Sequence, residues 1–147
     1  MTEGLNRQMH ATLRWVHGMQ FVATAGSNHG VVLDTGADHG GTDTGTTPME
    51  LVLDALAGCT AMDVVSILRK MRVEFRSFII NVRAERADEH PKVFTRIQLE
   101  YVVSGVNLDE TKIRQAVELS QTKYCSVSAM LKKACPVEWT VRVEEAT

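Results

Sequence analysis

Three short segments near the start of the chain alternate hydrophobic and polar residues, as strands with one covered face do. In residues 10–18, Leu13 and Trp15 share one face and the residue between them is an arginine. Residues 19–26 and 30–34 are two further candidates, and glycine-containing turns separate the three segments. The pattern predicts a three-stranded meander.

Residues 48–72 form the longest hydrophobic segment and predict one long helix, with Thr47 as its N-cap and Pro48 in its first turn. Hydrophobic side chains surround most of its circumference: Val52, Leu53, Leu56, Ala57, Ala61, Met62, Val64, Val65, Ile67 and Leu68. A helix that is hydrophobic on nearly all sides is buried on nearly all sides. A chain of 147 residues can hardly surround a helix ~37 Å long. We therefore expect a partner subunit to cover part of it.

The second half of the chain predicts five further elements, in the order strand, strand, helix, helix and strand: residues 76–86, 92–105, 107–124, 125–134 and 137–145. Asp109 is a plausible helix cap, and Pro136 ends the last helix. The whole order, β-β-β-α-β-β-α-α-β, predicts an α+β fold in which antiparallel sheets pack on a central helix. The length suits one domain that spans residues 1–147.

Composition and charge narrow the possible partners. Hydrophobic residues make up 44% of the chain and charged residues 23%, an ordinary balance for a globular protein. The formal net charge of −2 provides no positive electrostatic field that would attract nucleic acid, so no nucleic-acid partner is expected. We find no run of ~18 apolar residues and no apolar core of a signal peptide, so we expect no membrane partner and a cytoplasmic location.

The cysteines, Cys59, Cys125 and Cys135, are odd in number and widely spaced, which makes a disulfide framework a poor explanation. The sequence has no CxxC pair and no histidine pair at zinc spacing, so no metal site is expected. No flavin-binding or nucleotide-binding motif is apparent either, so no cofactor is expected.

Two of the cysteines lie in helical contexts that admit redox chemistry. Cys125 begins a helix, where free backbone N–H groups favour the thiolate and should lower its pKa. Cys59 lies within the long helix, 66 positions earlier, so only the fold can bring the two together. If they meet, a thiolate can become a sulfenic acid and be captured as a disulfide. The alternative is that they only pack, since free cysteine is among the most buried residue types.

PMELVLDALAGCTAMDVVSILRK (48–70) and the later YCSVSAML (124–131) resemble the osmotically inducible protein C / organic hydroperoxide resistance family. The shared features are a helix start with proline and glutamate, a cysteine about ten residues on, and a second cysteine at a Cys-x-V-S helix start. The resemblance implies an intertwined homodimer with the long helices at its centre. It also implies thiol-dependent reduction of organic hydroperoxides, with Cys59 attacking, Cys125 resolving and an external dithiol as reductant. Cys135 matches no family position.

This sequence departs from the family at two polar positions. The family's arginine lies in the turn between early strands, where the nearest match here is Asn28. The family's glutamate follows the proline directly, whereas here Met49 has that place and Glu50 comes next. Glu50 precedes Cys59 by about nine residues, which puts it on the opposite side of the helix and ~14 Å along the axis. It could support Cys59 from the other subunit, pair with a basic residue elsewhere, or simply favour the helix N-terminus.

A second function is compatible with the same scaffold. The apolar dimer interface could hold a small lipid-like molecule, with the cysteines regulatory or without a role, so that the protein binds or senses rather than catalyses. A purely structural dimer is a third reading. Thiol-dependent consumption of peroxide separates the first hypothesis from the other two.

Overall fold

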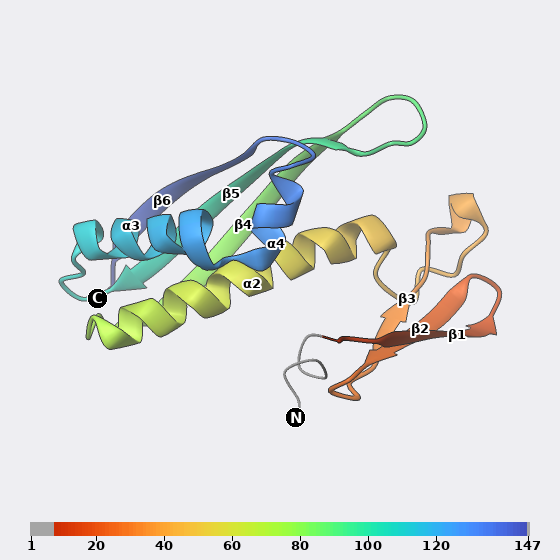
Figure 1. The fold of residues 1–147 in the computed structure, drawn as a ribbon, viewed down its shortest axis with the longest axis horizontal. Helices are drawn as coiled ribbons and strands as arrows, with labels where there is room; N and C mark the ends of the chain where they lie inside the picture. Colours follow the sequence, from red (N-terminus) through yellow and green to blue (C-terminus); the bar gives the residue numbers. More distant parts are fainter. Residues whose placement is uncertain (1–7, 147) are drawn as a thin grey trace. The chain divides into compact units, whose positions relative to one another are not determined.

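The structure, a computed structural model, describes residues 8–146 (Figure 1). Its internal contacts divide the chain into two compact units, one that ends at Val52 and one that begins at Leu53. The boundary falls inside the long helix α2 (Pro48–Lys70). Each unit is described by itself.

The first unit is the predicted three-stranded meander. Strands β1 (Ala11–His17), β2 (Gln20–Ala25) and β3 (Val31–Leu33) pair antiparallel in that order. A short 3-10 turn, η1 (Ala37–His39), follows. Every residue of β1 is exposed, as Trp15 illustrates with 66% of its surface accessible.

A buried carboxylate organises the loop after β3. Asp34 is 3% exposed and accepts hydrogen bonds from the backbone N–H groups of Thr35 (2.7 Å) and Thr44 (3.2 Å). The hydroxyl groups of Thr42 (2.8 Å) and Thr44 (2.5 Å) also donate to it. These bonds, led by that of the Thr44 hydroxyl, hold the pKa of Asp34 well below its usual range. Asp34 therefore ties this Gly- and Thr-rich loop to the end of β3.

Helix α2 begins with the predicted cap. The Glu50 N–H donates to Thr47 Oγ1 (3.3 Å), and the Thr47 N–H donates to the Glu50 carboxylate (2.9 Å), which makes a capping box. The helix ends at Lys70, two residues before the predicted end, and Arg72 then adopts a left-handed φ of 59°. Four residues spaced four apart are buried within the chain: Leu56, Thr60, Val64 and Leu68. Its own chain thus covers one stripe of α2 and not the whole circumference.

By length and mean hydropathy, α2 could cross a membrane, although it contains no uninterrupted run of ~18 apolar residues. Its mean hydropathy over 18 residues is 1.8, and 22% of that window is buried in the chain. Asp54 and Asp63 interrupt the hydrophobic run but leave the average high. The core helix of a globular protein passes the same test, so this property alone assigns no membrane location.

The second unit contains a three-stranded sheet in the order β4 (Ser77–Arg86), β5 (Phe94–Gly105) and β6 (Val137–Glu145). Strands β4 and β5 pair antiparallel, as predicted. Strands β5 and β6 pair parallel, with Leu99 opposite Trp139, so this sheet is mixed and not wholly antiparallel. Parallel neighbours require a crossover connection, because the chain must return to the same end of the sheet.

The crossover consists of α3 (Glu110–Leu119), one π-helical turn η2 (Ser120–Tyr124) and α4 (Ser126–Leu131). The two predicted helices thus correspond to α3 with η2 and to α4. Asp109 caps α3 as predicted, because its carboxylate accepts from two backbone N–H groups of the first turn.

Helices α2 and α3 lie side by side over one face of this sheet (Figure 1). Buried side chains of β5, α2 and α3 form the core there: Leu99, Tyr101, Val103, Leu56, Val64, Ile113 and Val117. The opposite face is polar, with an ion pair of 2.8 Å between Arg96 and Glu138 across β5 and β6. The α+β fold and the order of elements predicted from the sequence are confirmed.

Candidate active site

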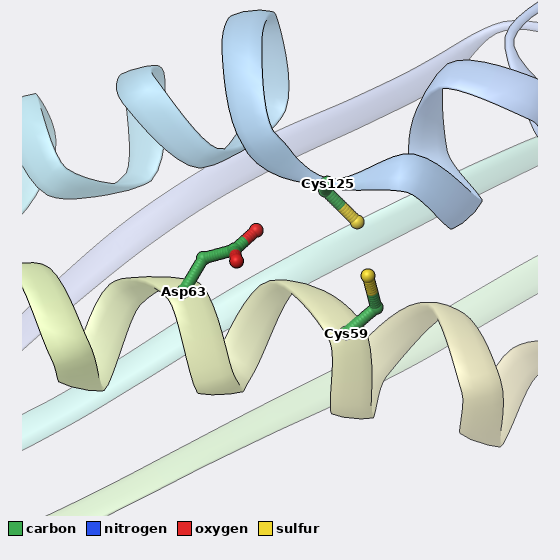
Figure 2. Close-up of side chains that lie close together, drawn as sticks. All are labelled: Cys59, Asp63 and Cys125. Carbon is green, nitrogen blue, oxygen red and sulfur yellow. The ribbon is translucent and has the colours of Figure 1, made fainter. Parts of the chain in front are cut away.

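Two cysteines from distant parts of the sequence meet in the second unit. Cys59 and Asp63 are four residues apart on α2, so they share one face of the helix, offset by about 40°. Cys125 faces them from the residue before α4. Figure 2 shows the two sulfur atoms turned toward each other, with the Asp63 carboxylate directed at the same space. The sulfur atoms and a carboxylate oxygen all lie within 4.8 Å of one another.

The two thiols differ in accessibility. Both are free, Cys59 is partly exposed and Cys125 is only 3% exposed. Asp63 is partly exposed as well. Cys59 is therefore the more accessible of the two residues to a small molecule from solvent.

Cys125 is held by its position as the N-cap of α4. The Ser128 N–H donates to Cys125 Sγ (3.4 Å), and the Cys125 N–H donates to the Ser120 carbonyl oxygen (2.8 Å). Burial nevertheless raises the pKa of the Cys125 thiol to about 11, and the neighbouring Cys59 and Asp63 add to the rise. The predicted lowering of this pKa is wrong, because burial outweighs the Ser128 N–H at the helix N-terminus.

A buried hydrogen-bond network ends at Asp63. The Ser120 hydroxyl donates to Asp63 Oδ2 (2.9 Å) and lies 2.7 Å from Thr60 Oγ1, which lies 2.6 Å from the Tyr101 hydroxyl. The Gln121 side-chain N–H₂ donates to Thr60 Oγ1 (3.1 Å) and to the Tyr101 hydroxyl (3.0 Å). Because the single Ser120 hydroxyl proton goes to Asp63, the Thr60 hydroxyl donates to Ser120 and the Tyr101 hydroxyl donates to Thr60. All three hydroxyl groups therefore point along one chain toward the carboxylate.

The same network extends to the second thiol. The Ser128 hydroxyl donates to Gln121 Oε1 (2.7 Å), which fixes the orientation of that amide, and the Ser128 N–H contacts Cys125. Burial raises the pKa of Tyr101, so its hydroxyl stays protonated and available as a donor. Asp63 and Cys125 are thus oriented by one set of buried polar residues.

The other candidate residues lie elsewhere. The Glu50 carboxylate is engaged in the capping box with Thr47, which lowers its pKa, so its role at the helix N-terminus is accounted for. Its support of Cys59 from a second subunit stays a prediction. Cys135 is buried at the α4–β6 junction and is not part of the Cys59 cluster. Asn28 lies in the β2–β3 turn of the first unit with a left-handed φ of 62°.

Asp63 is the site residue that the sequence interpretation missed. Its signal was available, because four residues after Cys59 is the same face of a helix. Nothing in the sequence pattern indicates that Ser120 would hold it, since the partner comes 57 positions later.

A groove opens beside Asp63 within the second unit. It has a volume of about 530 Å³ and is lined by Met62, Asp63, Ser66, Ile67, Lys70, Leu119 and Tyr124. Most of this lining is apolar, so the approach to the carboxylate suits a small molecule with a hydrocarbon part.

Replacing Asp63 with asparagine should lower the pKa of Cys125, because it removes the nearby negative charge that disfavours the thiolate. Alkylation of Cys125, followed by mass spectrometry across a pH series, measures the change. In the wild type the reaction should continue to accelerate toward pH about 11, and in the variant the profile should shift to lower pH. Asp54→Asn, an exposed position on the same helix, is the control. A profile unchanged by Asp63→Asn would contradict the electrostatic role of this residue.

Comparison of the sequence and the structure with known proteins identifies relatives of this chain. The protein YhfA of Escherichia coli K12 is 38% identical over 138 residues, 94% of this chain and 100% of that protein. A crystal structure of a hypothetical protein from Aquifex aeolicus is 30% identical, with a TM-score of 0.78 over 94% of this chain and 98% of that one. An organic hydroperoxide resistance protein OsmC of Legionella pneumophila shares the fold at 15% identity, with a TM-score of 0.67 over 91% and 96% of the two chains. The family profile described as OsmC-like protein matches residues 41–140. The chain therefore belongs to the OsmC-like protein family.

Proposed function

We propose that the protein is a thiol peroxidase that reduces organic hydroperoxides through Cys59 and Cys125, in defence against oxidative or osmotic stress. The observation that carries the proposal is the convergence of these two free thiols from segments 66 positions apart. The family supports it, because the similar Legionella pneumophila structure is described as an organic hydroperoxide resistance protein. The reducing cytoplasm is the compartment we propose for this chemistry.

The reaction has two chemical steps at the protein. The Cys59 thiolate attacks one oxygen of the peroxide, the O–O bond breaks, and the leaving alkoxide takes up a proton to become an alcohol. Cys59 is now a sulfenic acid. The Cys125 sulfur attacks it, its proton and the hydroxyl group leave as water, and a Cys59–Cys125 disulfide forms. An external dithiol then reduces the disulfide and is itself oxidised.

The difference in accessibility between the two thiols supports different roles for them in this proposal. Cys59 is the more accessible sulfur, which suits attack on a substrate from solvent. Cys125 is buried and protonated at neutral pH, which suits a resolving thiol that reacts only with an oxidised neighbour. The Asp63 carboxylate adds to the rise in the pKa of Cys125. We therefore expect turnover to increase toward alkaline pH.

The groove beside Asp63 supports an organic rather than an inorganic peroxide. Met62, Ile67 and Leu119 supply apolar surface in this groove beside Asp63, whose carboxylate lies within 4.8 Å of the two sulfurs. Such surface contributes binding energy for a hydrocarbon group and none for hydrogen peroxide.

We further propose that the protein works as a homodimer. Leu13 and Trp15 of β1 are 57% and 66% exposed, and Met62 of α2 is 77% exposed, which leaves large hydrophobic side chains for a second copy to cover. Sedimentation equilibrium should give about twice the 16.3 kDa mass of the chain. A mass of one chain would remove this part of the proposal.

The decisive experiment is treatment of the reduced protein with one equivalent of cumene hydroperoxide, followed by mass spectrometry without reductant. A peptide that joins Cys59 to Cys125 by a disulfide should appear, and dithiothreitol should restore both thiols. Cys135→Ser should behave as the wild type does, because Cys135 lies outside the cluster. Two unlinked thiols after complete consumption of the peroxide would overturn the assignment of Cys125.

A further inference from the structure

The reduced site also has the composition of a metal centre. Two cysteine sulfurs and one carboxylate oxygen lie within 4.8 Å of one another, and they come from Cys59, Cys125 and Asp63. We propose that these three residues bind one Zn²⁺ ion when both cysteines are reduced. Metal binding needs only the reduced pair, so this proposal does not depend on peroxidase activity.

The distances are close to what zinc requires. In a tetrahedral site with Zn–S near 2.3 Å and Zn–O near 2.1 Å, neighbouring ligand atoms are about 3.5–3.8 Å apart. The three atoms here need to approach one another by no more than about 1.3 Å to reach that spacing. Cys59 and Asp63 project from the same face of α2, so a small change of their side-chain rotamers supplies the movement.

The donor atoms select the kind of ion. Two sulfur ligands disfavour Mg²⁺ and Ca²⁺, which take oxygen ligands, and favour zinc and similar borderline-soft ions. Three protein ligands leave one tetrahedral position for water, the arrangement found in catalytic rather than structural zinc sites. On binding, the two thiols release their protons to solvent, so a dithiolate and a carboxylate surround the ion.

Two outer hydrogen bonds already orient the ligands. The Ser120 hydroxyl donates to Asp63 Oδ2 (2.9 Å), and the Ser128 N–H donates to Cys125 Sγ (3.4 Å). Hydrogen bonds of this kind hold the residues that ligate a metal in position and strengthen metal binding. The groove lined by Asp63 and Ile67 gives an ion a path from solvent.

Metal binding and disulfide formation exclude each other. A Cys59–Cys125 disulfide uses both sulfurs in one covalent bond and leaves Asp63 without the thiolates. An oxidant that removes two electrons from the pair therefore releases the ion. Zinc, in turn, ties up the sulfurs and protects them from oxidation.

The test is equilibrium dialysis of the full chain against Zn²⁺ alone, with a phosphine to keep the cysteines reduced. The wild type should bind one ion per chain. Cys59→Ser and Cys125→Ser should each lose binding, and Asp63→Asn should bind at least about tenfold more weakly. Cys135→Ser should bind as the wild type does. Circular dichroism checks that each variant is folded.

Cobalt gives a readout that needs no variant. Co²⁺ in the same site should show the charge-transfer absorption of thiolate ligation, and one equivalent of Zn²⁺ should remove it. Absence of that absorption in the wild type would overturn the proposal. Equal Zn²⁺ affinity of the wild type and the Asp63→Asn variant would also overturn it, because the site would then lack its third ligand.

Discussion

Substitution of Cys59 with serine should reduce dithiol-dependent consumption of cumene hydroperoxide by at least about 100-fold, because a serine hydroxyl has no anionic form near neutral pH to attack the peroxide. Cys59 is the accessible sulfur of the pair, so no other thiol of the cluster can take its place directly. The rate is measured as loss of peroxide in the presence of dithiothreitol. A Cys59→Ser variant with more than a tenth of the wild-type rate would contradict the proposed function.

Substitution of Cys125 should give a different kinetic defect from substitution of Cys59. The first step remains possible, so Cys125→Ser should consume about one equivalent of peroxide rapidly and then slow. Mass spectrometry should find Cys59 as a sulfinic or sulfonic acid after excess peroxide, because no neighbouring thiol captures the sulfenic acid. Cys135→Ser is the matched control, since it also removes a buried thiol but lies outside the cluster. Identical behaviour of the Cys59 and Cys125 variants would contradict their division of roles.

The Thr60→Val variant should be about 2–4 kcal/mol less stable than the wild type. Thr60 is fully buried and its hydroxyl lies within hydrogen-bond distance of Tyr101, Ser120 and Gln121. Valine keeps the shape and the branching of threonine but leaves these polar groups short of a partner in a dry environment. Urea denaturation followed by circular dichroism measures the free energy of unfolding.

Thr122→Val controls for the substitution itself. The Thr122 hydroxyl donates to the Glu118 carbonyl oxygen (2.7 Å) at an exposed position two residues beyond Ser120. Its loss should change the free energy of unfolding by no more than about 0.5 kcal/mol. Equal effects of the two substitutions would mean that the buried network contributes no more to the free energy of unfolding than one exposed hydroxyl group does.

The fold was largely predictable because hydrophobic periodicity reports local structure well. Alternation located β1 and β6 closely, and Asp109 and Thr47 marked two helix starts. The parallel pairing of β5 with β6 was not predictable, since alternation shows which residues share a face but not the direction of the neighbouring strand. The π-helical turn η2 likewise has no pattern that distinguishes it from the end of α3.

The site was predictable in part. Family resemblance brought Cys59 and Cys125 together, and the structure places them in mutual reach. The pKa of Cys125 was predicted in the wrong direction, because a helix start is visible in the sequence whereas burial is a property of the packed fold. The network of Thr60, Tyr101 and Ser120 joins three elements, so no local spacing could reveal it.

The parallel β5–β6 pair also governs when the site can assemble. Cys125 is carried on the crossover between these strands, so its position depends on β6 (Val137–Glu145) having docked against β5. This contact closes a long loop and is slow to form compared with local pairing. In the proposed mechanism, an oxidised Cys59 would lack its resolving thiol until this contact has formed. Protection of Cys59 from irreversible oxidation would then be a property of the completed fold and not of the newly made chain.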